Sequence, residues 1–387
     1  MSNSAIARVK AIPLNLPVEA KLLGVQRSTS LSACLVRVDT KDGLHGYGFT
    51  AITEEEVVAA VVNEVAGPAL LGEDALAHEK IWDKLYWLLS PRGQTGYASH
   101  AIAAIDIALW DIKGKAIGKP IWRLLGAARD RVPTYATFGF AFYDRETLAE
   151  AAKLWVSRGD KRLKMVVGHG ALQKRDTPRP LREVILEDAR RVRAVRDAVG
   201  EEPELYVDAN CSLDSYHAED LAHRIEPCGI SFFEEPVTQN DVGLLCALRS
   251  RIRIPIAAGQ NEGLAWRFRD LLVNSAIDIL QPNVVIGGGF TQCIRIAGMA
   301  AAFNVPIANG GAWPFHNMHL HAGLANGGLV EYHYPAVEAC RVIYRDLPEP
   351  KEGWLTLPER PGLGFEPDEA ALREAAKRPT ARGRAKG

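Results

Sequence analysis

The sequence predicts an α/β protein, a modified TIM (β/α) barrel that carries an N-terminal α+β capping domain. Two observations predict the barrel: short apolar runs recur eight times after residue 131, and seven of these runs precede an amphipathic stretch of helical length. A third observation predicts the added domain, since strand-like and then helix-like segments fill the chain before the first run. A chain of 387 residues is too long for one small domain and has room for both parts.

Residues 1–128 are predicted to form the capping domain. Residues 8–50 contain alternating apolar and polar side chains and the sequence Lys41-Asp42-Gly43, which is typical of a hairpin turn, so we expect antiparallel strands. Residues 55–118 carry apolar side chains at helical spacing, so we expect helices there. Strands followed by helices in this order indicate one α+β layer.

Residues 129–345 are predicted to form the barrel. Parallel strands need crossover connections, and eight strands with such connections close into a barrel, here with its last helix missing or replaced. Residues 346–387 are predicted to return to the capping domain and to end in a polar, solvated tail. The eight apolar runs cover residues 132–138, 163–167, 205–208, 230–234, 254–258, 277–280, 305–308 and 329–332.

The charge and hydropathy of the chain exclude several classes of partner. Lys and Arg total 46 and Asp and Glu total 47, so the net charge is −1, and neither nucleic acid nor a membrane is expected as the main partner. No segment approaches the roughly 20 apolar residues that span a bilayer, and the N-terminus lacks the pattern of a secretion signal. We therefore expect a cytoplasmic protein that binds a small molecule.

Polar side chains with oxygen ligands follow three successive runs of the predicted barrel. The third run ends in Asp208 and the fourth in Glu234, and Gln260 stands just past the fifth, so that neighbouring members are 26 positions apart. Equal spacing places the three side chains at the same point of successive βα units, at the carboxyl ends of the strands. Such oxygen ligands suit Mg²⁺. The alternative for each carboxylate taken singly is a helix cap.

The segments around these residues resemble the enolase superfamily, in its mandelate racemase/muconate lactonizing enzyme-like branch. Asp208-Ala209-Asn210 and Glu234-Glu235-Pro236 are similar to the metal-binding strand ends of that family. The similarity extends from about residue 8 to 370. It includes the helix at 103–115, the strand and turn at 277–289, and the closing segment at 361–364.

The resemblance implies a reaction at the carbon next to a substrate carboxylate. A base, Lys or His, removes the α-proton, and the metal stabilises the resulting enediolate. Asp208, Glu234 and Gln260 would hold Mg²⁺, and Glu331, at the end of the eighth run, resembles the family glutamate that donates a hydrogen bond to the substrate carboxylate. Related proteins often form symmetric oligomers, so a homo-oligomer is expected.

Four functional positions depart from the pattern of the family, and each change removes a titratable group. After the second run Lys164 is kept, but Val166 stands where the family often has a second lysine, its usual base. Asn283 stands at the position of an aspartate that pairs with a histidine, and the segment 308–311, which contains Asn309, has no histidine. The third metal ligand, usually Glu, is Gln260.

Three interpretations of these departures remain open. In the first, the protein uses a rearranged set of acids and bases: Lys164 serves as base or only binds the carboxylate, and His316 replaces the missing histidine. His169 is a further candidate, whereas His319 and His321 are read as packing or surface residues. In the second, the metal site is weakened, or Glu262 supplies the lost charge. In the third, the chain only binds an acidic metabolite.

The capping domain is expected to close the barrel mouth and to select the substrate. Its two loops would be residues 19–29 and 50–54. The candidates for contacts with the substrate are Lys21, Arg27, Thr50, Arg92, Asn210, Asn283 and Asn309.

The reaction that this sequence favours is the dehydration of a sugar acid, an aldonate or aldarate, to a 2-keto-3-deoxy acid. The absence of lysine at positions 166 and 283 argues against a dipeptide epimerase or a muconate cycloisomerase. The absent His–Asp pair argues against a racemase with two bases. The preference for a dehydratase rests on elimination and family analogy. A racemase, epimerase or cycloisomerase of a hydroxy acid remains the alternative, beside a binder without catalysis.

Overall fold

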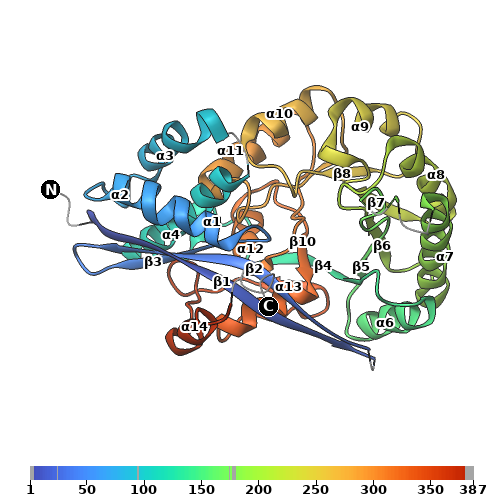
Figure 1. Ribbon diagram of the computed structural model, residues 1–387, viewed down its shortest axis with the longest axis horizontal. Helices are drawn as coiled ribbons and strands as arrows, with labels where there is room; N and C mark the ends of the chain where they lie inside the picture. The colour runs from blue at the N-terminus through green and yellow to red at the C-terminus, as the bar shows by residue number, and fades with distance from the viewer. Residues whose placement is uncertain (1–3, 24, 94–95, 174, 177–179, 380–387) are drawn as a thin grey trace.

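The computed structural model describes residues 4–23, 25–93, 96–173, 175–176 and 180–379. An antiparallel sheet with its helices forms one part, and a curled parallel sheet surrounded by helices forms the other (Figure 1). The N-terminal sheet passes alongside the barrel helices near the C-terminus of the chain. The predicted fold class, a modified barrel with an α+β capping domain, is confirmed.

The capping domain begins with a three-stranded antiparallel sheet in the order β1-β2-β3. The predicted hairpin turn is present, since Gly43 adopts φ +89°, a conformation that glycine reaches without steric cost. The strands are β1 (Ile6–Leu22), β2 (Val25–Thr40) and β3 (His45–Ala51). The helices are α1 (Glu55–Ala60), the π-helix η1 (Val61–Ala66), α2 (Gly67–Leu70), α3 (His78–Gly93), α4 (Tyr97–Ile117) and α5 (Ile121–Leu125).

Helix α4 is the central helix of this domain, and most of its side chains are buried. It crosses β3 closely, because a Cβ atom at Gly48 would lie 1.7 Å from the carbonyl oxygen of Ala104. On its other side, Asp106 accepts hydrogen bonds from the backbone N–H and the hydroxyl of Thr291, which belongs to the barrel. In the described part of the chain, no helix is both long and apolar enough to cross a membrane.

The barrel sheet has its strands in the order β10-β4-β5-β6-β7-β8-β9. All neighbouring strands along this path are parallel. The strands are β4 (Arg131–Gly139), β5 (Arg162–Val166), β6 (Glu204–Asp208), β7 (Ile230–Glu234), β8 (Ile256–Ala258), β9 (Ile279–Leu280) and β10 (Val330–His333). The α-helices between and after them are α6 (Arg145–Ser157), α7 (Leu181–Val199), α8 (Ser215–Ile225), α9 (Val242–Arg249), α10 (Ala265–Val273), α11 (Gly289–Ala302), α12 (Pro314–Gly323) and α13 (Tyr334–Ile343), with short 3-10 turns at Glu226–Cys228 and Thr238–Asn240.

The seventh predicted strand is the irregular one. Instead of a ladder, residues 305–308 form a single parallel bridge between Ile307 and Leu280. The backbone N–H of Ala308 donates to Leu280, and that of Asn309 donates to Leu329, so the segment still joins β9 to β10. We expected the last helix of the barrel to be missing or replaced, but a helix does follow β10. This helix, α13, packs against β1 of the capping domain.

The C-terminal segment lies on both parts of the molecule. Its strand β11 (Trp354–Thr356) pairs antiparallel with β4, and its helix α14 (Glu369–Ala375) contacts β1 and α13. The buried carboxylate of Asp111 in α4 accepts hydrogen bonds from the backbone N–H groups of Leu363 and Tyr47. This one carboxylate therefore ties the C-terminal segment to the sheet of the capping domain.

Candidate active site

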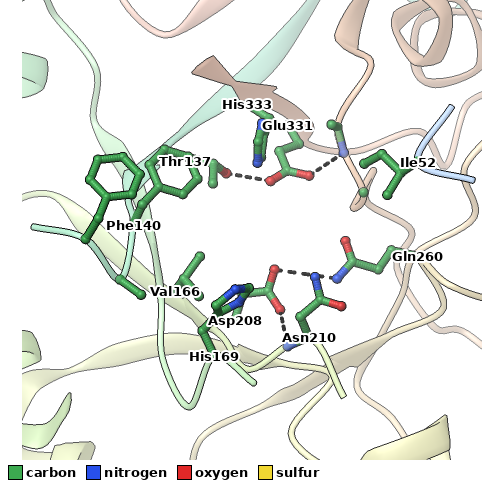
Figure 2. Close-up of a pocket in the computed structure, with 14 residues that line it drawn as sticks. Ile52, Thr137, Phe140, Val166, His169, Asp208, Asn210, Gln260, Glu331 and His333 are labelled. Atoms are coloured by element: carbon green, nitrogen blue, oxygen red, sulfur yellow. Dashed lines mark hydrogen bonds between the residues drawn. The ribbon is translucent and has the colours of Figure 1, made fainter. Parts of the chain in front are cut away.

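A cavity of about 470 Å³ opens at the carboxyl ends of the barrel strands (Figure 2). The capping domain contributes Ile52 to its wall, and the loop after β4 contributes a pair of stacked phenylalanine rings. In a barrel this end of the sheet is where catalytic side chains gather. The lining residues are Ile52, Thr137, Phe140, Ala141, Phe142, Val166, His169, Asp208, Asn210, Gln260, Gly311, Ala312, Glu331 and His333.

A lysine and three carboxylates form a buried cluster at the floor of this cavity. The Nζ atom of Lys164 lies 2.7 and 2.8 Å from the two oxygens of Glu234, 3.2 Å from Oδ2 of Asp208 and 2.9 Å from Oε1 of Glu331. The four side chains come from β5, β7, β6 and β10. Three carboxylates around one ammonium leave an excess of two negative charges when all four groups are ionised.

The pKa values of the cluster reflect burial and attraction acting in opposite directions. Burial alone would lower the pKa of Lys164, but Glu234 and Glu331 raise it well above its usual range. Burial and the neighbouring Asp208 raise the pKa of Glu234 well above its usual range. Burial would also raise the pKa of Glu331, but the Lys164 ammonium holds it below that range.

Lys164 is therefore a fixed cation and not a base. Its side chain is fully buried, it does not line the cavity, and its ammonium is surrounded by carboxylates. A group in this state has no free electron pair with which to accept a substrate proton. Lys164 was expected to act as a base or to bind the substrate carboxylate, but its ammonium contacts the protein's own carboxylates and does not line the cavity.

The polar groups at the floor fit a hard divalent cation. Within the described residues, no three acidic, histidine or cysteine side chains are arranged to hold a metal ion. Asp208 and Gln260 line the cavity and can supply a carboxylate oxygen and a neutral amide oxygen. Glu234 lies fully buried behind the cavity wall with both oxygens facing Lys164, so it would share its oxygens between that ammonium and the ion. Such a set with open positions suits Mg²⁺, which usually keeps water or substrate oxygens in its shell.

Gln260 is held so that its oxygen faces the cavity. Its Nε2 atom donates to Oε2 of the buried Glu235 at 3.1 Å and lies 3.5 Å from Oδ2 of Asp208. Because carboxylates only accept, the amide nitrogen must be on that side, and Figure 2 shows the oxygen turned toward the cavity. Glu262, the alternative ligand, is paired with Arg267 at 2.9 Å and does not line the cavity.

Glu331 accepts hydrogen bonds and has none to give. Oε1 accepts from the hydroxyl of Thr137 at 2.5 Å and faces Lys164, and Oε2 accepts from the backbone N–H of Ala312 at 2.7 Å. Three donors converge on one carboxylate, so the ionised form is favoured. Glu331 lies in the site as predicted, but the resemblance implied a donor to the substrate, and this arrangement makes it an acceptor.

The three predicted substrate-binding asparagines are placed differently. Asn210, with φ +45°, lines the cavity, and its backbone N–H donates to Oδ1 of Asp208. Asn283 is buried and donates to the carbonyls of Gly310 and Gly311, while Asn309 bridges Gly310 and the N–H of Glu331. Neither Asn283 nor Asn309 lines the cavity, so both fasten the loop after the seventh strand instead of contacting substrate.

His316 lies away from the cavity, in the contact between the barrel and the capping domain. Its ring stacks on Phe49 at 5.2 Å between centroids and meets Phe365 and Tyr344 edge-on. Burial lowers its pKa to about 3. This placement corrects the expectation that His316 replaces the missing base, because a ring enclosed by aromatic side chains cannot reach substrate. His319 and His321 are buried in the same helix, in agreement with the packing role expected for them.

Two other histidines do line the cavity. His169 follows β5 and is exposed, and His333 ends β10; Figure 2 shows them on opposite sides of the cavity. His169 was among the expected candidates, whereas the sequence analysis missed His333. The signal was available, since His333 stands two positions after Glu331, and side chains two apart in a strand point to the same face.

The capping domain reaches the cavity mostly through apolar contacts. Arg27 is exposed on the β1–β2 hairpin, with its guanidinium 5.9 Å from the ring centre of the cavity residue Phe142. Thr50 is fully buried and hydrogen-bonds the Val285 carbonyl and His100, so it joins the two domains and does not line the cavity. The side chains of Lys21 and Arg92 lie outside the described residues.

Comparison with known families agrees with this architecture along nearly the whole chain. The family model described as enolase C-terminal domain-like matches residues 146–371. The model for the mandelate racemase/muconate lactonizing enzyme N-terminal domain matches residues 4–126. Together they cover the capping domain and the barrel from α6 onward.

Individual relatives include enzymes of two reaction types. An arabinonate dehydratase of Saccharolobus solfataricus is 32% identical over 335 residues, covering 85% of this chain and 86% of that protein. A D-galactarolactone cycloisomerase of Agrobacterium fabrum is 31% identical over 377 residues, covering 93% of this chain and 95% of that protein. The expectation of a relationship to enolase-superfamily enzymes is thereby confirmed.

Among solved structures, L-talarate dehydratase from Polaromonas sp. JS666, complexed with Mg and L-glucarate, matches with a TM-score of 0.81 at 30% identity. The match covers 95% of this chain and 96% of that one. The expected magnesium is thus present in a relative of the same fold. The chain therefore belongs to the enolase superfamily, in its mandelate racemase/muconate lactonizing enzyme-like branch.

Proposed function

We propose that the protein is a Mg²⁺-dependent dehydratase of a sugar acid, which yields a 2-keto-3-deoxy acid. The observation that carries this proposal is the crowding of three buried carboxylates around one ammonium, since Asp208, Glu234 and Glu331 surround Lys164. Two negative charges are in excess when all four groups are ionised, and the raised pKa of Glu234 reflects the missing compensation. Buried charge of this size is costly unless a cation compensates it. A divalent cation would restore neutrality and would attract a substrate carboxylate to the same place.

The chain's own residues would divide the work as follows. Asp208, Glu234 and Gln260 would hold Mg²⁺, which supplies electrostatic stabilisation of the charge that develops on the substrate carboxylate. Lys164 holds the carboxylates in position and limits their mutual repulsion. Glu235 orients Gln260 by accepting its amide hydrogen. These groups act by position and charge and exchange no proton with substrate.

His169 is the residue that we assign as base. It lies in the loop after β5, three positions beyond Val166, which occupies the place of the usual family lysine. Its ring is exposed at the cavity and has no hydrogen-bond partner among the described residues, so a ring nitrogen is free to accept a proton. In the first step the Cα–H bond breaks, the proton moves to His169 and the electron pair stays on the substrate as an enediolate.

The second step distinguishes the possible reactions. In dehydration the electron pair forms a Cα=Cβ bond, the Cβ–O bond breaks, and the hydroxyl leaves as water with the proton that His169 received. The enol then becomes the 2-keto-3-deoxy acid. The relatedness to arabinonate dehydratase supports this outcome, and the relatedness to a cycloisomerase supports the same first step. The cytoplasmic location and the homo-oligomer remain predictions.

Proton NMR in D₂O tests the proposal. The protein is incubated with Mg²⁺ and each member of a set of mono- and diacid sugars, and the α-proton signal is followed. Loss of that signal together with a 2-keto-3-deoxy product is the expected result, and Asp208→Asn or EDTA should abolish it. Exchange without dehydration would indicate an epimerase, and an isomer of unchanged mass a cycloisomerase. Binding of a sugar acid without exchange would overturn the proposal in favour of a binder.

A further inference from the structure

The cavity lacks a donor at the place where the family pattern provides one. Glu331 accepts from Thr137 and Ala312 and is paired with Lys164, so its two oxygens are already engaged as acceptors. A carboxylate in this state cannot donate a hydrogen bond to a substrate oxyanion. Such a hydrogen bond must come from a neutral or positively charged group. Without it, a negatively charged substrate oxygen that faces Glu331 would be repelled.

The next side chain on the same face of β10 is His333, whose ring is oriented by the helix that it begins. His333 is the N-cap of α13, and its Nδ1 atom accepts a hydrogen bond from the backbone N–H of Ala336 at 3.3 Å. The Phe140 ring meets the imidazole edge-on, with 5.4 Å between centroids. The ring is therefore fixed on one side by the cap and on another by an aromatic contact.

This cap decides which nitrogen carries the hydrogen. A ring nitrogen that accepts from an N–H group is unprotonated, so the neutral imidazole of His333 carries its hydrogen on Nε2. Protonation of Nδ1 would place two N–H groups against each other at the start of α13. In the part of the chain that the structure describes, Nε2 has no hydrogen-bond partner, and Figure 2 shows the ring directed into the cavity beside Glu331.

We infer that His333 acts as a neutral imidazole that donates its Nε2–H to the oxyanion formed on the substrate carboxylate, the role that ionised Glu331 cannot fill. The inference rests on the proposed function, since it requires an oxyanion to develop in the cavity. A fixed donor aimed at developing charge stabilises the transition state more than the ground state. A neutral donor also adds no positive charge that would compete with a metal ion for Asp208.

The groups that face His333 are consistent with a neutral ring. Burial lowers its pKa, and the Lys164 ammonium acts in the same direction, whereas Glu331 and Asp208 act against both. Phe140, from the loop after β4, is apolar and does not titrate. The hydrogen bond from the backbone N–H of Ala336 also requires an unprotonated Nδ1, so the geometry favours the neutral imidazole as well.

Two variants at this position separate the donor from the cap. Asparagine is a preferred N-cap residue but is too short to place a donor where Nε2 lies, so His333→Asn keeps the helix start and removes the donor. Glutamine can place an amide N–H near the position of Nε2, so His333→Gln keeps the donor and weakens the cap. Both proteins are compared with the unchanged chain by thermal unfolding and by α-proton exchange. The exchange is measured with Mg²⁺ and the sugar acid that the NMR screen identifies.

We expect His333→Asn to unfold at the temperature of the unchanged protein and to lose about 10²–10³ in kcat. His333→Gln should recover at least about tenfold of that loss, a size typical of one hydrogen bond. Both variants should keep the shape of the pH profile, because His333 is assigned no proton transfer.

Three results would overturn the inference or its basis. Exchange by His333→Asn within about threefold of the unchanged protein would exclude a donor role at the scale expected for one. A His333→Gln variant as slow as His333→Asn, with one limb of the pH profile lost, would show that His333 transfers protons. Absence of exchange in the unchanged protein would overturn the proposed function itself, and with it the oxyanion that this inference requires.

Discussion

The cavity floor and the contact between α12 and the capping domain both bury titratable side chains, yet their surroundings act on these side chains in opposite ways. In the cavity floor each buried charge has a charged partner within 3.2 Å. Around α12, both ring nitrogens of His316 and one ring nitrogen each of His319 and His321 have no hydrogen-bond partner among the described residues. The first region holds Lys164 and Glu331 in their charged forms through their mutual contact, and the second keeps its histidines neutral.

The difference teaches that the residue type alone does not identify a catalytic group. Burial lowers the pKa of His316 to about 3, so this imidazole is neutral at neutral pH. Its surroundings are aromatic, and its burial serves the packing of the two domains. Lys164 is equally buried but is surrounded by carboxylates, and it stays charged.

The largest effect is expected when the pairing in the cavity floor is broken. Lys164→Met should lower the free energy of unfolding by about 3–5 kcal/mol, because removal of one partner leaves buried carboxylates uncompensated. Urea unfolding at neutral pH without metal measures this loss, and added Mg²⁺ should offset part of it. The matched control is Lys153→Met, since Lys153 pairs with Glu150 on the surface. Its loss should stay below about 1 kcal/mol. Equal losses in both variants would contradict the pairing argument.

The second prediction compares histidines of the two regions by activity. His169→Asn should reduce the rate of α-proton exchange by about 10²–10⁴, the usual contribution of general base catalysis. His316→Phe should keep the rate within about threefold, since the ring is only packed against Phe49, Tyr344 and Phe365. Proton NMR in D₂O gives both rates under one condition. A slow His316→Phe with a fast His169→Asn would reverse the assignment of the base.

The periodicity of the sequence was sufficient to predict the barrel strands and the positions of Asp208 and Glu234 at their ends. Apolar runs followed by helical stretches define the strands, and the equal spacing of Asp208, Glu234 and Gln260 places them on neighbouring strands whatever the details of packing. The seventh strand was predicted as a regular run, but only Ile307 forms a bridge there. Irregular pairing depends on neighbours from distant parts of the chain.

The roles of individual side chains were harder to predict because they depend on contacts across the sequence. His316 follows the seventh run, which suggested the cavity, but α12 begins at Pro314, two residues earlier, and the helix places the His316 ring against Phe49 of the capping domain. Asn283 seemed free to meet substrate, yet the carbonyls of Gly310 and Gly311 occupy its amide. Sequence spacing carries no information on either contact.

The third prediction concerns stability at acid pH. The pKa of His316 falls from 6.5 in the unfolded chain to about 3 in the folded protein, so below pH 6.5 the unfolded chain binds a proton that the folded protein excludes. The free energy of unfolding should therefore decrease as the pH is lowered from 6.5 to 3. This histidine contributes about 1.4 kcal/mol per pH unit to the slope. Urea unfolding at several pH values should show a shallower slope for His316→Phe, and an unchanged slope would mean that His316 binds its proton in the folded state.

The smallest effect is expected from His316→Phe at neutral pH, where no proton is involved. The substitution removes two buried ring nitrogens that have no partner, a desolvation cost of about 1–3 kcal/mol, while the stack on Phe49 is kept. The larger phenyl ring must fit between Phe365 and Tyr344, which offsets part of the gain. We expect a net rise of about 1 kcal/mol in the free energy of unfolding. His316→Ala, which removes the ring contacts as well, should instead lose about 2–4 kcal/mol. If His316→Phe loses as much as His316→Ala, the imidazole nitrogens have a bound partner such as a buried water, and the contrast between the two regions would no longer hold.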